Sequence, residues 1–174
     1  MEFIDLGLSV NWATSNLGTD VPEECGDIFA WGETTPRKTF NSQNYIHKND
    51  QRELPDTLTK EFDAVTTLLG EGYRMPTDSE AKELCELCHW EIITHKKGKY
   101  EWKVTGKNGN SIILPASFKE SDIEWKVGGF WLSTRHYHPP YQEFADTLSF
   151  GKYAFGVNTE DNYKGLSIRP VKIK

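Results

Sequence analysis

The segment MPTDSEAKELCELCHW (residues 75–90) limits the possible folds more than any other stretch of this sequence. Thr77 and Glu80 have the spacing of a capping box, which satisfies free backbone amides at the start of a helix. Apolar side chains then recur at helical spacing, so one face of the helix must be covered by other elements. The residues on this face are Ala81, Leu84, Cys85, Leu87 and Cys88.

Only strand patterns follow this helix. Stretches rich in β-branched and aromatic residues predict strands, and Asn108-Gly109 between two of them predicts a tight hairpin. A second, shorter helix is expected at 61–70. The resulting fold class is α+β, with two helices before a mostly antiparallel, twisted sheet. The stretches expected as strands after the long helix are 90–94, 100–106, 110–117, 128–135, 143–151, 153–157 and 165–173.

The part of the chain before the helices holds two further strand candidates, at 5–14 and 27–31. Between them and the helices, residues 34–60 are polar and contain two prolines, which predicts a long surface excursion. Arg74 and Arg169 each precede a hydrophobic-Pro or Pro unit. We expect these arginines to hold backbone carbonyls or an acid, with Asp5, Asp27 and Glu33 as the candidate acids.

Composition fits one folded domain spanning residues 1–174. Hydrophobic residues make up 37% and charged residues 26%, as in globular proteins that fold in water. The net charge of −6 and the absence of Lys/Arg clusters argue against nucleic acid as a partner. No apolar run is long enough for a transmembrane segment. No leader pattern follows Met1, which suggests either a cytoplasmic protein or a domain whose signal has been removed.

Three cysteines are too few for a disulfide framework. Cys85 and Cys88 form a C-x-x-C pair, but they lie late in the predicted helix, where the dipole does not favour a thiolate. We interpret both as small buried apolar side chains. A redox or metal role for the pair stays open as the alternative.

Six motifs occur in order along the chain: DLGLSVNWAT (5–14), PEECGDIFAWGE (22–33), GYRMPT (72–77), GNSIILPA (109–116), FWLST (130–134) and GLSIRPV (165–171). Together they resemble the Fibrobacter succinogenes major paralogous domain, a family abundant in Bacteroidetes. The chain departs from the family pattern at Ser15, where members often carry a cysteine, and at Cys25, where tyrosine is usual. The resemblance implies a C-type-lectin-like fold, with the terminal strands paired and long loops at one end.

The resemblance also implies a non-catalytic ligand-binding or adhesion module of an exported protein. Its expected location is extracellular or at the cell surface, with a cytoplasmic, intracellular role as the alternative. The motif RHYHPPY (135–141) and the region up to residue 163 mix aromatic with small polar residues, which is typical of binding loops. We predict that one exposed face contacts a protein or glycan ligand through Arg135, Tyr137, His138, Tyr141, Asn158, Asp161, Asn162 and Tyr163.

Two other functions were weighed against binding. An enzyme could pair Ser133 with His136 or His138 as nucleophile and base, and a fold relative modifies sulfatases, but no G-x-S-x-G elbow is present. A calcium lectin could use Asn158, Glu160, Asp161 and Asn162, yet the Glu-Pro-Asn and Trp-Asn-Asp pairings of such lectins are missing. A metal between His136 and His138 would need a third ligand. We therefore expect no catalytic residue, no metal and no cofactor.

Overall fold

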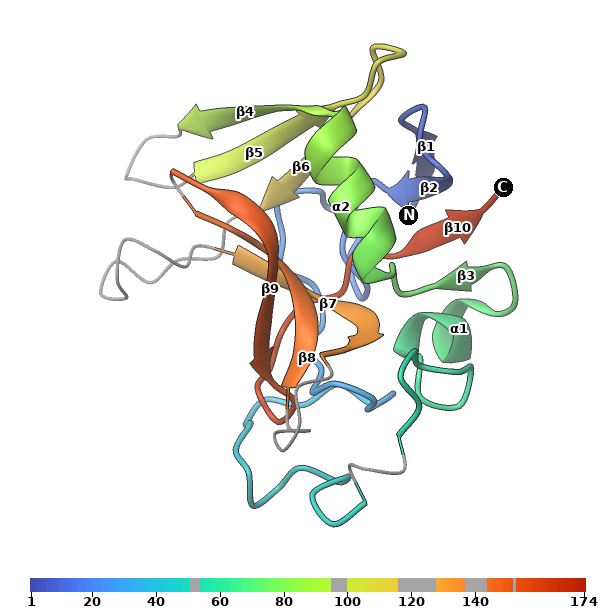
Figure 1. The fold of residues 1–174 in the computed structure, drawn as a ribbon, viewed down its shortest axis with the longest axis vertical. Helices are drawn as coiled ribbons and strands as arrows, with labels where there is room; N and C mark the ends of the chain where they lie inside the picture. The colour runs from blue at the N-terminus through green and yellow to red at the C-terminus, as the bar shows by residue number, and fades with distance from the viewer. Residues whose placement is uncertain (51–53, 95–99, 116–127, 137–143, 152) are drawn as a thin grey trace.

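A computed structural model describes residues 1–50, 54–94, 100–115, 128–136, 144–151 and 153–174 of the chain. Within these residues it has two helices and ten strands, which confirms the α+β class (Figure 1). The helices are α1 (Ala64–Leu69) and α2 (Asp78–Leu87). The strands are β1 (Phe3–Asp5), β2 (Val10–Ala13), β3 (Tyr73–Arg74), β4 (His89–Thr94), β5 (Tyr100–Thr105), β6 (Ser111–Pro115), β7 (Gly128–Arg135), β8 (Phe144–Phe150), β9 (Phe155–Asp161) and β10 (Val171–Ile173).

The strands form three small sheets in place of the one sheet expected from the sequence. Their strand orders are β1-β2-β10-β3, β4-β5-β6 and β7-β8-β9. Every pair of neighbouring strands in these sheets is antiparallel, as predicted. In the second sheet the Asn108-Gly109 turn joins β5 to β6, and Gly109 has a φ of 87°, which glycine adopts without strain.

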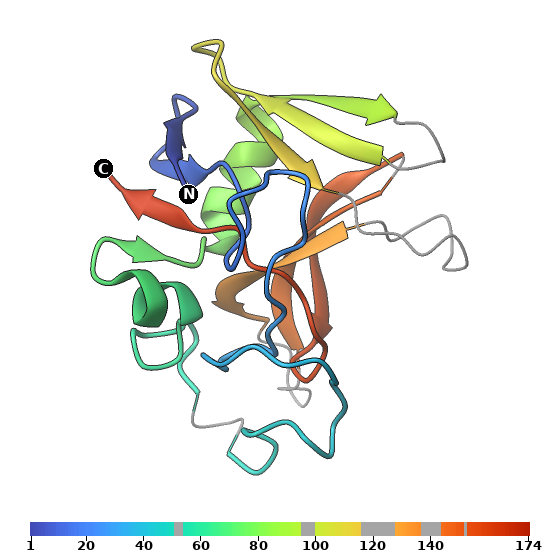
Figure 2. The same ribbon diagram turned by 180° about the vertical axis from the view of Figure 1, so that it is seen from behind.

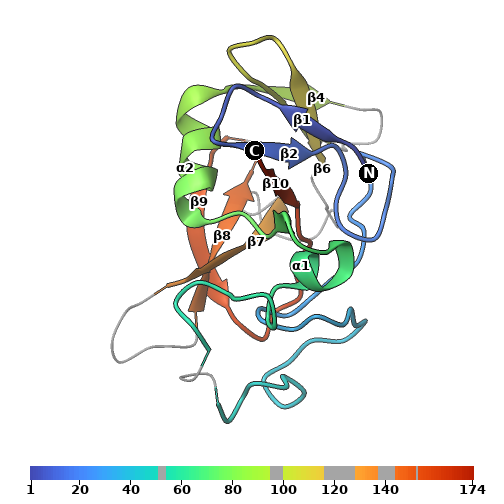
Figure 3. The same ribbon diagram turned by 90° about the vertical axis from the view of Figure 1, so that its right-hand side faces the viewer.

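The two ends of the chain meet in the first sheet. β10 pairs with β2, with Val171 opposite Trp12 and Ile173 opposite Val10, so the predicted side-by-side placement of the terminal strands is confirmed. Figure 3 shows both termini close to these strands. The strand expected over 165–173 is shorter, however, because Pro170 has no amide to donate to a ladder. Before it, Leu166 and Ser167 make only isolated bridges, to Phe29 and Phe130.

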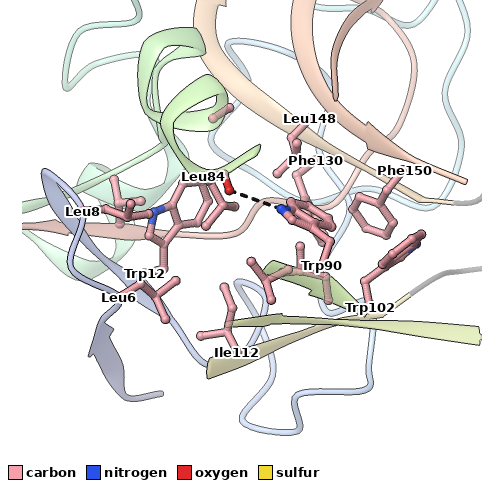
Figure 4. Close-up of a cluster of buried hydrophobic side chains, with 14 of the residues drawn as sticks. Leu6, Leu8, Trp12, Leu84, Trp90, Trp102, Ile112, Phe130, Leu148 and Phe150 are labelled. Atoms are coloured by element: carbon pink, nitrogen blue, oxygen red, sulfur yellow. Dashed lines mark hydrogen bonds between the residues drawn. The ribbon is translucent and has the colours of Figure 1, made fainter. Parts of the chain in front are cut away.

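The central parts of β7 and β8 are buried on both faces of their sheet, whereas β9 at its edge is partly exposed. Along β7, Phe130 and Leu132 belong to one apolar cluster while Trp131, between them, belongs to another. On β8, Leu148 likewise faces the first cluster and Ala145 the second. The first cluster, shown in Figure 4, joins this sheet to α2 and to the β4–β5–β6 sheet. A strand covered on both sides reads as a nearly continuous apolar run, which fits the sequence FWL at this point.

Helix α2 begins as predicted. The hydroxyl of Thr77 accepts from the Glu80 amide, and the Glu80 carboxylate accepts from the Thr77 amide at 2.9 Å. Leu84 on its inner face is fully buried. Leu87, expected on the same face, is 40% exposed instead because the helix ends there.

Cys85 and Cys88 are partly buried against the first apolar cluster and form no disulfide. Burial raises the pKa of the Cys85 thiol to about 11, and burial also raises the pKa of Cys88. Both cysteines are therefore protonated near neutral pH. This fits the interpretation of the pair as small apolar side chains.

The two arginines hold partners, as expected, but not the acids that the sequence suggested. Arg74 Nη1 donates to Glu80 Oε2 at 2.8 Å. Arg169 has no exposed surface, and its guanidinium donates to the carbonyls of Ala13 at 3.2 Å and Ile113 at 2.9 Å. Because Ala13 and Ile113 belong to different sheets, Arg169 ties the first sheet to the second.

Candidate functional site

The end of β7, the start of β8 and the end of β9 meet at one end of the β7–β8–β9 sheet. β7 ends at Arg135, opposite Ala145 near the start of β8, and Phe144 stands opposite Asp161 at the end of β9. Both attachment points of the 137–143 segment and the turn after β9 therefore lie at the same end. We call this region the loop end and define it by residues 56–58, 135–136, 144–146 and 161–164.

The excursion reaches the loop end along the outer edge of β7. The Leu58 amide donates to the Ser133 carbonyl at 2.9 Å, and the Arg135 amide donates to the Asp56 carbonyl at 2.7 Å. A further bond, from the Trp31 amide to the Asn162 carbonyl at 2.9 Å, ties the start of the excursion to the turn after β9. In Figures 1 and 2 the excursion forms the lower end of the molecule, and both termini lie above it.

Two of the predicted ligand contacts are not on an exposed face. Arg135 is 6% exposed and Asn162 is 1% exposed, so the prediction of exposure is wrong for both. Arg135 turns inward because its guanidinium donates to the Leu54 carbonyl at 2.6 Å and lies 5.6 Å from the ring of Trp31. Arg135 therefore supports the loop end from inside, whereas Asn162 is tied to Trp31 through its backbone carbonyl.

The other described candidates are accessible. Asn158 is exposed on β9, opposite Thr147, and Asp161 and Tyr163 are half-buried at the loop end. Lys164 Nζ lies 5.4 Å from the centre of the Tyr163 ring. The remaining candidates, Tyr137, His138 and Tyr141, lie outside the described residues. Asp161, Asn162, Tyr163 and Arg135 are thus brought together, and Asn158 sits three residues further back along β9.

A His–Asp pair next to the 137–143 segment was missed by the sequence analysis. His136 Nδ1 lies 3.1 Å from Asp146 Oδ1, which joins the end of β7 to β8. Asp146 is 8% exposed, and burial raises the pKa of its carboxyl group while His136 acts in the opposite direction. The one signal in the sequence was an acid inside the apolar strand FADTLSF, where a carboxylate needs a partner.

The start of α2 is fastened to the same part of β7. The Asp78 amide donates to the Thr134 hydroxyl at 3.1 Å, and Lys82 donates to the Asp78 carboxylate at 2.9 Å. Lys82 and Asp78 are also close enough to Asp146 to influence its pKa, in opposite directions. The base of the loop end is therefore a network of hydrogen bonds among charged and polar side chains.

The alternatives from the sequence can be compared with this geometry. Ser133 is buried and its hydroxyl donates to the Pro76 carbonyl at 3.2 Å, while the His136 ring contacts Asp146. Within the described part of the chain, no three His, Cys, Asp or Glu residues are grouped so that they could hold a metal ion. Glu160 and Asp161 are consecutive on β9 and point to opposite faces of the strand.

Scans against protein-family models, curated proteins and solved structures found no match to this chain. The family resemblance therefore rests on the six sequence motifs. None of the helices within the described residues is long and apolar enough to cross a membrane.

Proposed function

We propose that this protein is a non-catalytic ligand-binding or adhesion module with a C-type-lectin-like fold, whose loop end contacts a protein or glycan. One observation carries this proposal. The two attachment points of the 137–143 segment, the turn after β9 and the excursion all meet at one end of a sheet whose strands β7 and β8 are buried on both faces. Loops held on a rigid scaffold are where proteins commonly place their binding residues.

The residues that support the loop end are already held in place, so binding there would cost little conformational entropy. Arg135 is buried and donates to the Leu54 carbonyl, the Asn162 backbone carbonyl accepts from Trp31, and the His136–Asp146 contact joins the strand ends next to the 137–143 segment. A ligand that meets residues already held in place loses less of its binding energy to ordering them. This assigns Arg135 and Asn162 a positioning role in place of direct contact.

The residues proposed to contact the ligand are the polar and aromatic candidates other than Arg135 and Asn162. Tyrosine gives a large contact area with few rotatable bonds, and amide and carboxylate groups add directional hydrogen bonds. No covalent step is needed for such a surface to act. The proposed contacts are Tyr137, His138, Tyr141, Asn158, Asp161 and Tyr163.

We place this module outside the cell or at the cell surface, following the family that the motifs resemble. A cytoplasmic protein is the alternative. Fractionation of the native organism with an antibody against the purified chain tests this, because a cytosolic signal alone would exclude a role in adhesion to external ligands.

The binding proposal is tested with two named probes, a glycan array and a phage-displayed random peptide library. We expect at least one probe class to bind the wild-type chain and to lose binding in the Tyr137→Ala/Tyr141→Ala variant, with little change in melting temperature. Tyr153→Ala is the matched control, since Tyr153 is 72% exposed at the opposite end of the same sheet. Its binding should equal that of the wild type.

A large fall in melting temperature for the double variant would show that these tyrosines belong to the core. Binding that survives the double variant, or that is lost equally in the Tyr153→Ala control, would also contradict the proposal. Turnover of a hydrolase or oxidase substrate that disappears with His136→Ala would favour the enzyme alternative.

A further inference from the structure

The excursion is held in one conformation by a buried carboxylate, although residues 34–50 contain neither helix nor strand. Glu33, at its start, is only 3% exposed. Its Oε1 accepts from Arg37 Nη2 at 2.7 Å and from the backbone amide of Ile46 at 3.0 Å. One carboxylate oxygen therefore fixes two points of the excursion that are nine residues apart.

The residues on either side of Ile46 are both inserted into the protein. The Tyr45 hydroxyl donates to the Trp31 carbonyl at 2.8 Å, and the ring of His47 contacts the Gly32 carbonyl at 3.1 Å. Tyr45 is 1% exposed and His47 is 9% exposed, whereas Ile46 between them is 65% exposed. The backbone around Ile46 is therefore pinned at three consecutive residues, and its side chain is directed outward.

An exposed apolar side chain is common and needs no special explanation by itself. Leu68 on α1, for example, is 52% exposed on an ordinary helix surface. Ile46 differs because a buried charge and two buried rings hold it in place. Such pre-organisation removes much of the entropy that a loop would lose on binding, and it is typical of contact residues.

We propose that Ile46 is an apolar anchor for a protein partner, which receives it in an apolar pocket with an acidic rim. This inference rests on the proposed binding function and chooses protein over glycan as its ligand. An aliphatic side chain gains affinity by leaving water for an apolar pocket. Sugars offer mainly hydroxyl groups, and an isoleucine has no polar atom or aromatic face to meet them.

The charge around Ile46 indicates the acidic rim. The chain as a whole carries a net charge of −6, yet the exposed charges within residues 34–50 of the excursion are Lys38, Lys48 and Asp50. The fourth charged side chain of residues 34–50, Arg37, is already paired with Glu33. This leaves a small excess of positive charge beside Ile46, and opposite charge on the partner would steer the encounter.

The position of the excursion joins this anchor to the loop end. Residues 56–58 run along β7 at the loop end, and the Trp31 amide bonds to the Asn162 carbonyl. The Trp31 carbonyl also accepts a hydrogen bond from the Tyr45 hydroxyl. Trp31 therefore connects the part of the excursion around Ile46 with the turn after β9. A protein partner could therefore contact Ile46 and the loop end in one interface.

The test uses the phage-displayed random peptide library as the probe, followed by calorimetric titration of synthetic copies of the selected peptides. We expect selected peptides to combine apolar residues with Asp or Glu. Ile46→Ser should weaken their binding at least 10-fold while leaving the melting temperature unchanged, because the side chain is exposed. Leu68→Ser is the matched control and should bind as the wild type does.

A second variant tests whether the Glu33 carboxylate holds the backbone of Ile46 in place. Glu33→Ala keeps the Ile46 side chain but removes the acceptor of its amide, and we expect it to weaken binding as well. Peptides that bind Ile46→Ser as tightly as wild type, but not Tyr137→Ala/Tyr141→Ala, would overturn this inference and leave the proposed function standing. Binding on the glycan array with no selected peptide would also overturn it. Probes that are insensitive to Ile46 and to both tyrosines would contradict both proposals.

Discussion

The β7–β8 pair and the 34–50 excursion lie in contact with the same buried tryptophan, but they are held in different ways. The strands are buried between two apolar clusters, and their backbones are paired in a ladder whose register shifts between Trp131 and Arg135. Residues 34–50 of the excursion form no strand ladder and depend on single contacts made by Glu33, Tyr45 and His47. Trp31 belongs to both, since its indole Nε1 donates to the Leu132 carbonyl while its own carbonyl accepts from Tyr45.

This difference predicts how each region responds to substitution. Apolar packing spreads its stabilisation over many contacts and tolerates changes that keep volume. A buried carboxylate that fixes two donors has no substitute, because removing it leaves those donors unpaired. The strands should therefore control the stability of the whole domain, while Glu33 should control the shape of the excursion.

The largest expected effect is on the strands. Trp131 has no exposed surface, and its indole donates to the Phe29 carbonyl at 2.8 Å. Trp131→Ala should lower the free energy of unfolding by about 3–5 kcal/mol, through lost burial and an unfilled cavity. Urea unfolding followed by circular dichroism measures this change. A loss below about 1 kcal/mol would show that the second apolar cluster is not needed for global stability.

A smaller and more local effect is expected in the excursion. Glu33→Ala should cost about 1–3 kcal/mol, because it leaves the Ile46 amide and Arg37 Nη2 without their acceptor, while Arg37 Nη1 keeps the Asn44 carbonyl. Limited proteolysis should then cut within 34–50 much faster than in the wild type, with cleavage sites read by mass spectrometry. Thr39→Ala, an exposed position in the same excursion, is the control. Equal cleavage rates in all three proteins would contradict the pinning role of Glu33.

At the start of α2, a partly buried carboxylate is expected to stabilise the fold in a way that depends on pH. Burial alone would raise the pKa of Glu80, but hydrogen bonds from Arg74 and Thr77 hold it below its ordinary value of 4.5. The ionised carboxylate therefore stabilises the fold above pH 4.5, and this stabilisation is lost as the pH falls through the folded-state pKa. Glu80→Gln should cost about 1 kcal/mol at pH 7 and progressively less in acid.

Melting curves of wild type and Glu80→Gln between pH 2 and pH 7 measure this difference. Glutamine can still accept the Thr77 amide in a capping box, so the variant isolates the charge. A difference in stability that stays constant over the whole pH range would show that the ion pair with Arg74 contributes nothing.

The smallest effect concerns reactivity, with no change in stability. With a thiol pKa of about 11, Cys85 is ionised to only about 0.1% at pH 8. Its alkylation by iodoacetamide should be slow and should rise about tenfold for each pH unit up to pH 10. Mass spectrometry of the peptide containing Cys85 gives the rate. Fast alkylation near pH 7 would restore a redox or metal role for the pair of cysteines.

Sequence reasoning succeeded where the signal is local. The Thr77–Glu80 capping box and the Asn108-Gly109 hairpin each depend on residues a few positions apart, and both are present. β7 spans the same residues, 128–135, that its aromatic and apolar sequence predicted. The pairing of β2 with β10 is not local, and it was expected only because the motifs resemble those of a known family.

The interior of the site could not be predicted because its contacts join distant residues. Arg135 was assigned to the exposed face together with the rest of the RHYHPPY motif, but its carbonyl partner Leu54 lies 81 positions earlier. Asp146 gave no sign of its contact with His136, since neighbours across a hairpin depend on register. Ile46 likewise looked like any apolar residue in a polar loop until the burial of Glu33 was known.

The pairing of the chain ends also has a mechanical consequence. β1 and β10 both run antiparallel to β2, so they are parallel to each other on its two sides. Tension applied between Met1 and Lys174 would pull β1 backward and β10 forward, sliding each along β2. Because the ladder bonds lie across the strands, this motion loads them together in shear instead of opening them one at a time. A domain joined to its surroundings at both ends would therefore keep its loop end intact while under load.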